Sequence, residues 1–360
     1  MTFVAHFAVC YTQILNAEAK ICGELPEFAK SAQTLREFYK IMLLTRLFDQ
    51  RAISLQRTGK MGTYAPVNGQ EAIGTAIGHA LEKDDIFIPY YRDYAAQLQR
   101  GVSLHEILAY WGGDERGNNY VKTCHDPGIC VPIASQCLHA AGIAFALKYK
   151  NTKNIALVAL GDGATSEGDF YEAINVAGAW QLPLVFVINN NQWAISVPLN
   201  KQTKCETLAQ KAIAGGFTGE QVDGNDILAL RQVIGEAITK ARQGKGPSLI
   251  EAISYRLSHH TTADDATRYQ PEAEVKEARN KEPLIRFKQF LFDQKILTEE
   301  LEQEIQKSCT EEVNAEVDKF LHMPKPQVTS AFDYHFATFP DYLIEQRATA
   351  IEEEENNALS

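Results

Sequence analysis

Two short polar motifs near the middle of the chain contain the residue types needed to bind a metal ion and an anion. The first is Gly-Asp-Gly-Ala-Thr-Ser-Glu-Gly at 161–168, and the second is Asn-Asn-Asn at 189–191. Asp162 and Asn191 offer hard oxygen ligands of the kind that Mg²⁺ prefers, usually in sites shared with phosphates. Glycines let the backbone approach a ligand, and a helix start beside them offers free N–H groups to a diphosphate. The pair of motifs therefore indicates a Mg²⁺-diphosphate site.

Each motif directly follows an apolar run that predicts a buried strand. The runs are Ile-Ala-Leu-Val-Ala-Leu at 155–160 and Leu-Val-Phe-Val-Ile at 184–188, and both have the length of strands. Between them, a Ser-x-x-Asp pattern that begins at Ser166 predicts a helix cap before apolar positions at helical spacing. We expect one βαβ unit with its ligand site at the carboxyl ends of the strands. An isolated Gly-Asp-Gly would more often be a plain turn.

The rest of the chain alternates between helical and extended patterns, so we predict an α/β fold with one doubly wound, mainly parallel sheet. The expected segments are an N-terminal arm over 1–34, the ligand-binding α/β domain over 35–270 and a C-terminal helical extension over 271–360. Helices are expected over 35–56, 69–79, 134–148, 166–177, 226–243 and 298–320, and further strands over 86–89 and 248–257.

Composition narrows the class of protein. The 360 residues are 45% hydrophobic, and 35 Lys and Arg against 46 Asp and Glu give a net charge of −11. No stretch combines basic and aromatic residues as a nucleic-acid surface would, and no apolar run is long enough to span a membrane. The seven cysteines are scattered and odd in number, which favours reduced thiols and a cytoplasmic location. We therefore expect neither a nucleic-acid nor a membrane partner.

The two motifs, with the residues around them at 161–169 and 190–196, resemble the thiamine diphosphate signature. More narrowly, they resemble the alpha subunit of the decarboxylating component of 2-oxo acid dehydrogenase complexes. The resemblance covers nearly the whole chain and implies thiamine diphosphate and Mg²⁺ as cofactors. Further blocks in the order of that family are 46–51, 69–72, 91–93, 222–226 and 255–260.

The resemblance assigns roles to individual residues. It implies that Asp162, Asn191 and the backbone carbonyl of Trp193 bind the metal ion, although relatives carry Tyr or Phe at 193. His260 is the implied catalytic residue, in a loop whose second histidine contacts the diphosphate. The implied cofactor-binding residues are Tyr91, Arg92, Ile133, Gly161, Asp162, Gly163, Ala164, Glu167, Asn191 and His260.

Residue chemistry supports two of these roles directly. The guanidinium of Arg92 is a planar fork of donors that suits phosphate oxygens. An imidazole titrates near neutrality, so His260, in a loop after an expected strand, is the best acid/base candidate. Glu167 is in the first turn of the expected helix, where a carboxylate is normally just a favourable charge, and we rank it second.

The chain departs from the family at several positions. Many relatives carry a functional histidine within the segment 112–119, where this chain has Asp-Glu-Arg at 114–116; whether Arg116 or His125 replaces it stays open. Thr261 stands where mammalian relatives have a phosphorylated serine, so such control is not expected. The cysteines and histidines over 124–139 lack a paired Cys-x-x-Cys and overlap the expected cofactor wall at 132–136, which disfavours a zinc site.

One α/β domain is only half of a thiamine site in this family. The resemblance implies that the other half is a beta subunit in an α₂β₂ heterotetramer, with the cofactor at their interface. It further implies decarboxylation of a small 2-oxo acid, with transfer of the acyl group to a lipoyl-bearing dihydrolipoyl acyltransferase. The stretches 46–56 and 64–66 look closest to bacterial members that act on pyruvate, whereas 258–265 looks equally like branched-chain relatives.

Alternatives within the cofactor class are an acetoin dehydrogenase or a split transketolase, although no sugar-phosphate-binding residues are identifiable. From other classes, we considered a non-catalytic regulatory subunit and a nucleotide-binding protein. The intact pair of Asp162 and Asn191 disfavours the first. The second is disfavoured because both the Gly-x-Gly-x-x-Gly and the P-loop pattern are missing from the sequence.

Overall fold

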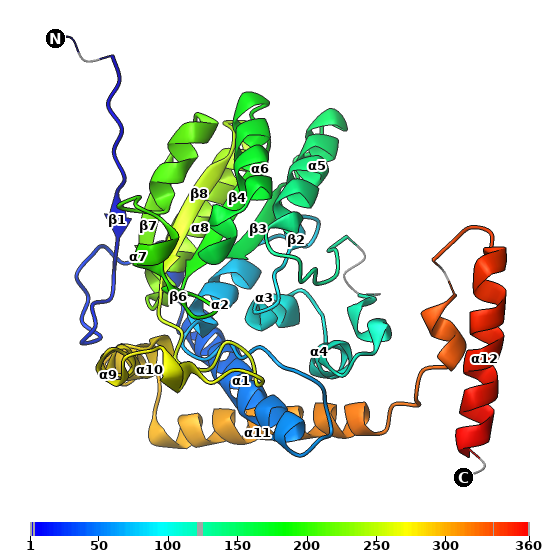
Figure 1. Cartoon of the computed structure of the whole chain (residues 1–360). Coiled ribbons are helices and arrows are strands. Elements are labelled where there is room, and N and C mark those ends of the chain that lie inside the picture. The colour runs from blue at the N-terminus through cyan, green and yellow to red at the C-terminus, as the bar shows by residue number, and fades with distance from the viewer. Residues whose placement is uncertain (1, 3, 121–124, 334, 359–360) are drawn as a thin grey trace. The chain divides into compact units, whose positions relative to one another are not determined.

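The central element of the fold is a six-stranded sheet, seen in a computed structural model that describes residues 2, 4–120, 125–333 and 335–358. The strand order is β1-β7-β8-β4-β3-β2, and all neighbouring strands run parallel (Figure 1). A parallel sheet with helices packed on it is the α/β fold that the sequence predicted. The strands are β1 (Tyr11–Thr12), β2 (Ile86–Ile88), β3 (Ala156–Gly161), β4 (Leu184–Asn190), β7 (Gly219–Asp223) and β8 (Ser248–Ile253), with a separate antiparallel pair, β5 (Trp193–Ala194) and β6 (Val197–Pro198).

Each of the six helices predicted with bounds is found, in the same order along the chain and with ends that agree to within a few residues. The long first helix, for example, was expected over 35–56 and is α1. The helices are α1 (Ala32–Arg57), α2 (Glu71–Ala80), α3 (Tyr94–Gln99), α4 (Leu104–Trp111), α5 (Ser135–Tyr149), α6 (Gly168–Ala179), α7 (Leu199–Gln202), α8 (Ile227–Arg242), α9 (Glu272–Asn280), α10 (Pro283–Asp293), α11 (Glu299–Leu321) and α12 (Asp341–Ala358).

Strands β3 and β4 form the centre of the core because helices cover both of their faces. On one face, Val158 and Phe186 belong to a buried cluster with Phe170 of α6 and the alanine-rich side of α5. Side chains alternate along a strand, so Leu157 and Val187 point to the other face, where α8 contacts β4, β7 and β8. This two-sided burial explains why both strands read as continuous apolar runs.

The register of β3 and β4 brings the two polar motifs to one edge of the sheet. Gly161 lies opposite Asn189, so Asp162 and Asn191 leave neighbouring strands at nearly the same level. The sequence therefore predicted correctly that the motifs meet at the carboxyl ends of the strands.

Two predicted element ends are wrong. Ser166 does not cap α6, because Thr165 closes a 3-10 turn over Gly163–Ser166 by donating from its N–H and hydroxyl to the carbonyl oxygen of Asp162, and α6 begins only after Glu167. Strand β8 ends at Ile253 rather than at 257. Beyond it, two backbone N–H groups donate to the carbonyls of the asparagine motif instead of continuing the ladder.

The N-terminal segment is attached to the main sheet. Tyr11–Thr12 pair with β7 as an edge strand, and the carboxylate of Asp226 accepts hydrogen bonds from the N–H groups of Ile14 and Leu15, both at 2.6 Å. The chain divides into two compact units, 1–317 and 318–360; in the second, α12 packs on a short 3-10 helix, Val328–Ala331. The segment borders expected at 34 and 270 remain predictions. Within the described ranges, none of the helices has the length and apolar character needed to cross a bilayer.

Candidate functional site

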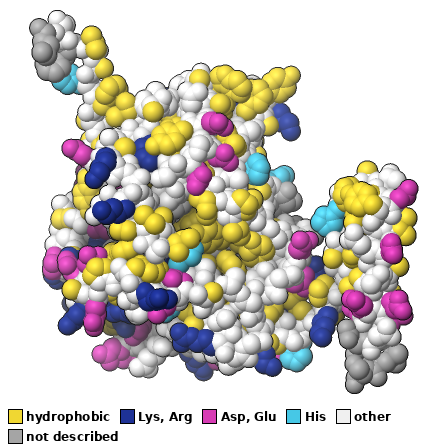
Figure 2. All heavy atoms as spheres, in the orientation of Figure 1, with side chains coloured by type: hydrophobic (Ala, Val, Ile, Leu, Met, Phe, Trp, Pro, Cys, Tyr) yellow, Lys and Arg dark blue, Asp and Glu magenta, His cyan; other side chains and the backbone are white. Residues whose placement is uncertain are grey.

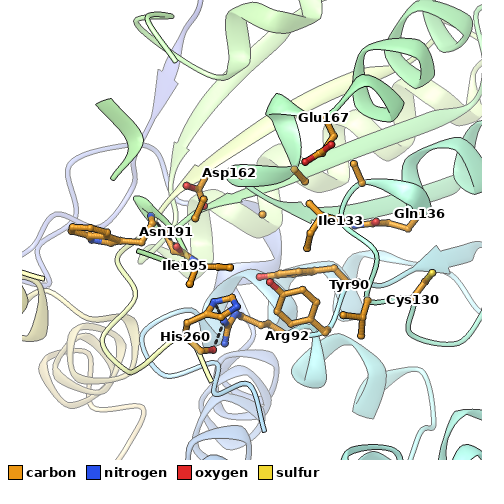
Figure 3. Close-up of a pocket in the computed structure, with 18 residues that line it drawn as sticks. Tyr90, Arg92, Cys130, Ile133, Gln136, Asp162, Glu167, Asn191, Ile195 and His260 are labelled. Carbon is orange, nitrogen blue, oxygen red and sulfur yellow. Dashed lines mark hydrogen bonds between the residues drawn. The ribbon is translucent and has the colours of Figure 1, made fainter. Parts of the chain in front are cut away.

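A cavity of about 200 Å³ opens at the carboxyl ends of β3 and β4 (Figure 3). Every residue that the sequence assigned to the cofactor or the metal lies in its wall. Figure 3 shows Asp162 and Asn191 on one side, Arg92 and His260 together below, and Ile133 and Gln136 on the far side. The lining residues are Tyr90, Tyr91, Arg92, Cys130, Val131, Ile133, Ala134, Gln136, Gly161, Asp162, Gly163, Ala164, Glu167, Asn191, Trp193, Ala194, Ile195 and His260.

Two adjacent backbone segments, which we call the strand-end turns, form one side of the cavity: residues 161–166 after β3 and 189–195 after β4. They touch, because a Cβ on Gly163 would lie 2.7 Å from the Cβ of Ala194. Gln192 and Ile195 adopt left-handed φ angles of 73° and 53°, which is rare for a β-branched residue and typical of functional sites. Glycine at 163 is therefore required for the two turns to approach each other.

Asp162 is an uncompensated buried carboxylate. Its side chain lines the cavity, is 1% exposed and accepts a 2.7 Å hydrogen bond from Nε2 of Gln202. Burial raises the pKa of Asp162 to about 6, since the charged form loses its hydration. Within the described ranges, no Lys, Arg or His side chain forms an ion pair with it. The carboxylate is thus placed where a cation would relieve the cost of its burial.

Asn191 and Trp193 add neutral oxygens beside this carboxylate. The amide of Asn191 donates to Oε1 of Gln70 at 2.9 Å, and its Oδ1 accepts from the N–H of Trp193 at a long 3.2 Å. The carbonyl oxygen of Trp193 is 3.5 Å from Nη1 of Arg256. Carbonyl oxygens have two lone pairs, so both can still bind a metal ion. One carboxylate and two neutral oxygens are a donor set that fits Mg²⁺. Within the described ranges no three His, Cys, Asp or Glu side chains converge on a point.

Arg92 and His260 form a hydrogen-bonded pair across the cavity floor (Figure 3). Nη2 of the buried Arg92 donates to Nδ1 of His260 at 3.0 Å and to its carbonyl oxygen at 2.6 Å. Nδ1 is therefore an acceptor, which places the imidazole proton on Nε2. Arg92 also donates to the carbonyl of Pro66. The guanidinium is thus held by three contacts and lines the cavity.

The expectation that His260 titrates near neutrality is wrong for this structure. Burial and the positive charges of Arg92 and Arg256 lower the pKa of His260 to about 3, against a weaker opposing effect of Asp264. The imidazole is therefore neutral at physiological pH. An anion bound beside Arg92 would offset the guanidinium charge and raise the pKa of His260 again.

The remaining predicted residues complete the wall. The ring of Tyr91 meets the His260 ring edge-on at 6.2 Å and lies 5.2 Å from the guanidinium carbon of Arg92. Ile133 is half exposed at the rim, just before α5. Glu167 is exposed and is the N-cap residue of α6. Tyr91 therefore supports the Arg92–His260 pair, whereas Glu167 makes no contact with it.

The histidine loop, residues 258–265, is joined to the strand-end turns by Arg256, which sequence reasoning noted only as part of a family block. This fully buried guanidinium donates to the carbonyl of Ile195 at 2.7 Å and to the hydroxyl of Tyr269 at 2.6 Å. Tyr269 donates to Asp264, and that carboxylate accepts from the N–H of His260 at 2.7 Å. One side chain therefore connects both parts of the site.

Sequence reasoning did not predict the contacts of three glutamines, although two of them lie in segments that it noted, 69–72 and 132–136. Gln70 holds Asn191 and Gln202 holds Asp162, while Gln136 donates to the carbonyl of Ala159 at 3.2 Å and leaves its own Oε1 without a partner. Glutamine has no local signature for such a role, so only the folded chain identifies them.

Neither residue considered as a substitute for the missing family histidine lines the cavity. Arg116 pairs with Asp114, with Nε 2.9 Å from Oδ1, and His125 is exposed. Of the disfavoured zinc ligands, Cys124 lies outside the described residues. The six described cysteines are free thiols.

The fold and the cavity define an α/β protein that binds a ligand at the carboxyl edge of a parallel sheet, between buried oxygen ligands and an arginine–histidine pair. The sequence model of the family described as dehydrogenase E1 component matches residues 39–329. The chain is 41% identical over 337 residues to the pyruvate dehydrogenase E1 component subunit alpha of Staphylococcus aureus, covering 93% of this chain and 90% of the relative. The corresponding subunit of Bacillus subtilis is 39% identical over 335 residues, with the same coverage. This chain belongs to the dehydrogenase E1 component family, and it is therefore an enzyme component that depends on thiamine diphosphate.

Proposed function

We propose that the chain acts as the alpha subunit of a pyruvate dehydrogenase E1 component, which decarboxylates pyruvate oxidatively and passes the acetyl group to a lipoyl group. The similarity to the bacterial subunits of that name extends over 93% of the chain. The observation that carries the proposal is the cavity itself, where a buried carboxylate, two neutral oxygens and an arginine–histidine pair face one space.

The cavity residues can be assigned to the metal ion and the diphosphate of the cofactor. Asp162, Asn191 and the carbonyl oxygen of Trp193 would hold Mg²⁺. Arg92 and the backbone N–H groups of the turn after β3 would hold the diphosphate. When bound, thiamine diphosphate supplies the electron sink for loss of CO₂ from a 2-oxo acid.

His260 is the residue that would handle a proton. Because its Nδ1 accepts from Arg92 and no described residue accepts from its Nε2–H, this N–H can donate to a phosphate or substrate oxygen. The pKa of His260, about 3 in this structure, would rise if a diphosphate offset the charge of Arg92, so His260 would be protonated more readily in the loaded site than in the free site. This coupling gives His260 an acid role during acyl transfer only when the cofactor is in place.

A beta subunit would complete the site. The described chain contains one α/β sheet, and Val131 and Ile133 at the cavity rim are about half exposed. Apolar side chains continue from the rim along α5 as Leu138 and Phe145, and Tyr149 at its end is 83% exposed. Figure 2 shows apolar side chains gathered across one face of the molecule. Exposed apolar surface of this extent marks an interaction site, which suits an α₂β₂ heterotetramer that serves a dihydrolipoyl acyltransferase.

We propose that this assembly is cytoplasmic, since the free cysteines among the described residues are typical of a reducing compartment and the two relatives compared above are bacterial.

The test is a substrate comparison with the complete enzyme. The chain is co-expressed with a beta subunit of the same family from the same organism, supplied with Mg²⁺ and thiamine diphosphate, and assayed with an artificial electron acceptor. Pyruvate, 3-methyl-2-oxobutanoate and acetoin are compared. We expect the highest kcat/KM with pyruvate. Turnover of only one of the other two would reassign the substrate, and no turnover together with no cofactor binding would refute the proposal.

A further inference from the structure

Lys211 is a buried ammonium group that the roles assigned so far do not use. It lies in the 3-10 segment Ala209–Gly215 and is 5% exposed. Nζ donates to the carbonyl oxygen of Thr165 at 2.7 Å and to its hydroxyl at 2.9 Å, and it lies 5.3 Å from the centre of the Tyr171 ring. No carboxylate of the described part of the chain forms an ion pair with it. Lysine is almost never buried unless it is paired with an opposite charge.

The position of Lys211 connects it to the cavity. Thr165, which receives both hydrogen bonds, closes the turn after β3 by donating from its hydroxyl to the carbonyl of Asp162 at 2.8 Å. Asp162, Gly163 and Ala164, the three residues before it, line the cavity. The ammonium group therefore lies directly behind the cavity wall formed by this turn.

A structural role alone does not account for the charge. Hydrogen bonds to Thr165 hold the 3-10 segment against the turn, but a neutral donor could make them without the cost of burying an ion. In a medium of low polarity, a positive charge acts over several ångströms on a ligand of opposite sign. A diphosphate held by this turn would supply the negative charge that Lys211 lacks among the described residues.

We propose that Lys211 is a positioning residue that fixes the turn after β3 and supplies the positive potential by which the cavity prefers a diphosphate to an uncharged group. This inference rests on the proposed function, because it takes thiamine diphosphate as the ligand. The ammonium group does not touch the ligand; it acts through Thr165 and through its field.

The experiment measures ligand binding to the co-expressed alpha and beta subunits with Mg²⁺. Lys211→Met removes the charge and the hydrogen bonds, Lys211→Gln removes the charge and keeps a donor, and Lys211→Arg keeps both. Three constants are measured for each variant: the dissociation constants of thiamine diphosphate and of unphosphorylated thiamine, and the inhibition constant of inorganic pyrophosphate as a competitor of thiamine diphosphate. The melting temperature of the cofactor-free protein is recorded for each variant.

Lys240→Met is the matched control. Lys240 is also partly buried and donates to neutral groups, the carbonyl of Pro247 at 2.9 Å and the hydroxyls of Thr218 and Ser248 at 3.3 and 3.1 Å. Lys240 belongs to α8, and its amine contacts the start of β8, at the opposite end of the strands from the cavity. The control therefore matches the loss of an amine that donates to neutral groups, and it differs from Lys211 in lying far from the turn after β3 and in being less buried.

We expect Lys211→Met and Lys211→Gln to raise the dissociation constant of thiamine diphosphate and the inhibition constant of pyrophosphate roughly tenfold. The dissociation constant of thiamine should stay nearly unchanged. Lys211→Arg should leave all three constants close to those of the unaltered enzyme. Lys240→Met should change none of the three. An equal loss for thiamine and thiamine diphosphate, or no loss in Lys211→Gln, overturns the inference. If the Lys211→Met subunit does not assemble with the beta subunit, the comparison of Lys211→Gln with Lys211→Arg tests the inference. Absence of thiamine diphosphate binding by the unaltered enzyme overturns the proposed function as well, which distinguishes the two failures.

Discussion

The strand-end turns and the histidine loop face the same cavity, but different kinds of contact hold them. The strand-end turns are continuous with β3 and β4, whose register sets Gly161 opposite Asn189. The histidine loop is held by hydrogen bonds to segments that are distant in the chain: the side chain of Arg92 donates to His260, and the backbone N–H of Thr262 donates to the backbone carbonyl of Tyr64 at 2.9 Å. We propose that the strand-end turns determine whether the cofactor binds, whereas the histidine loop affects the reaction of the bound cofactor.

The largest effect is expected in the strand-end turns. Asp162→Ala removes the only carboxylate of the proposed metal site and should abolish Mg²⁺-dependent binding of thiamine diphosphate, a loss of at least ~100-fold. Calorimetric titration of the co-expressed subunits measures it. The circular dichroism spectrum should be unchanged, because the side chain makes no ion pair within the described ranges. Unchanged affinity would remove Asp162 from the metal site and end the distinction between the two regions.

The ionised side chain of Asp162 should also lower the free energy of unfolding of the cofactor-free protein. Because burial raises the pKa of Asp162 to about 6, its ionised form opposes folding above the unfolded pKa of about 4, and this cost disappears as the pH falls through 6 toward 4. Asp162→Asn should therefore stabilise the cofactor-free protein at pH 7 by about 2 to 3 kcal/mol and have little effect at pH 4. Melting curves at both pH values test this. An equal gain in stability at both pH values would show that the ionisation of Asp162 is not the cause of the gain.

Arg92 belongs to both regions in function, since it faces the cavity and holds the histidine loop. Arg92→Met should weaken thiamine diphosphate binding roughly tenfold, the effect of losing a charge-assisted hydrogen bond, and should raise the pKa of His260, which the guanidinium now lowers. Titration calorimetry and the pH dependence of the His260 NMR signal measure the two effects. Arg116→Met, outside the cavity, is the control. A His260 pKa that stays low would show that burial and Arg256 are enough to set it.

A smaller effect is expected in the histidine loop. Tyr269→Phe removes the hydroxyl that accepts from Arg256 at 2.6 Å and donates to Asp264. Loss of a single hydrogen-bonded link should lower kcat about threefold, with the dissociation constant of thiamine diphosphate unchanged. Steady-state kinetics and a binding titration separate the two. Weakened binding with normal kcat would mean that the loop, too, holds the cofactor.

The smallest effect is expected for Trp193→Tyr. The proposed metal ligand at this position is a backbone carbonyl, and the loop geometry depends on Arg256, which donates to the neighbouring carbonyl of Ile195 at 2.7 Å. Affinity for Mg²⁺ should therefore match that of the unaltered enzyme in a metal titration. A marked loss would mean that the indole ring itself, which packs 5.4 Å from the ring of Tyr269, supports the site.

The same contrast explains what could be predicted from the sequence. The apolar runs before Asp162 and Asn191 and the polar residues after them are local patterns, and they located the strand-end turns correctly. The pKa of His260 could not be predicted, because it depends on burial and on Arg92, which lies 168 positions away in the chain. Gln70, 121 positions from Asn191, has no local signal either. The cap expected at Ser166 failed because Thr165 forms the competing turn.

The central claim is that the cavity is the metal and diphosphate half of a thiamine site. A crystal structure of the assembled alpha and beta subunits with thiamine diphosphate and Mn²⁺ in place of Mg²⁺ tests it most directly, since anomalous scattering locates the manganese. We predict the ion at about 2.1 Å from oxygens of Asp162, Asn191 and Trp193, with a diphosphate between it and Arg92. A metal ion bound elsewhere, or a cofactor whose diphosphate does not reach the turn after β3, would contradict the account.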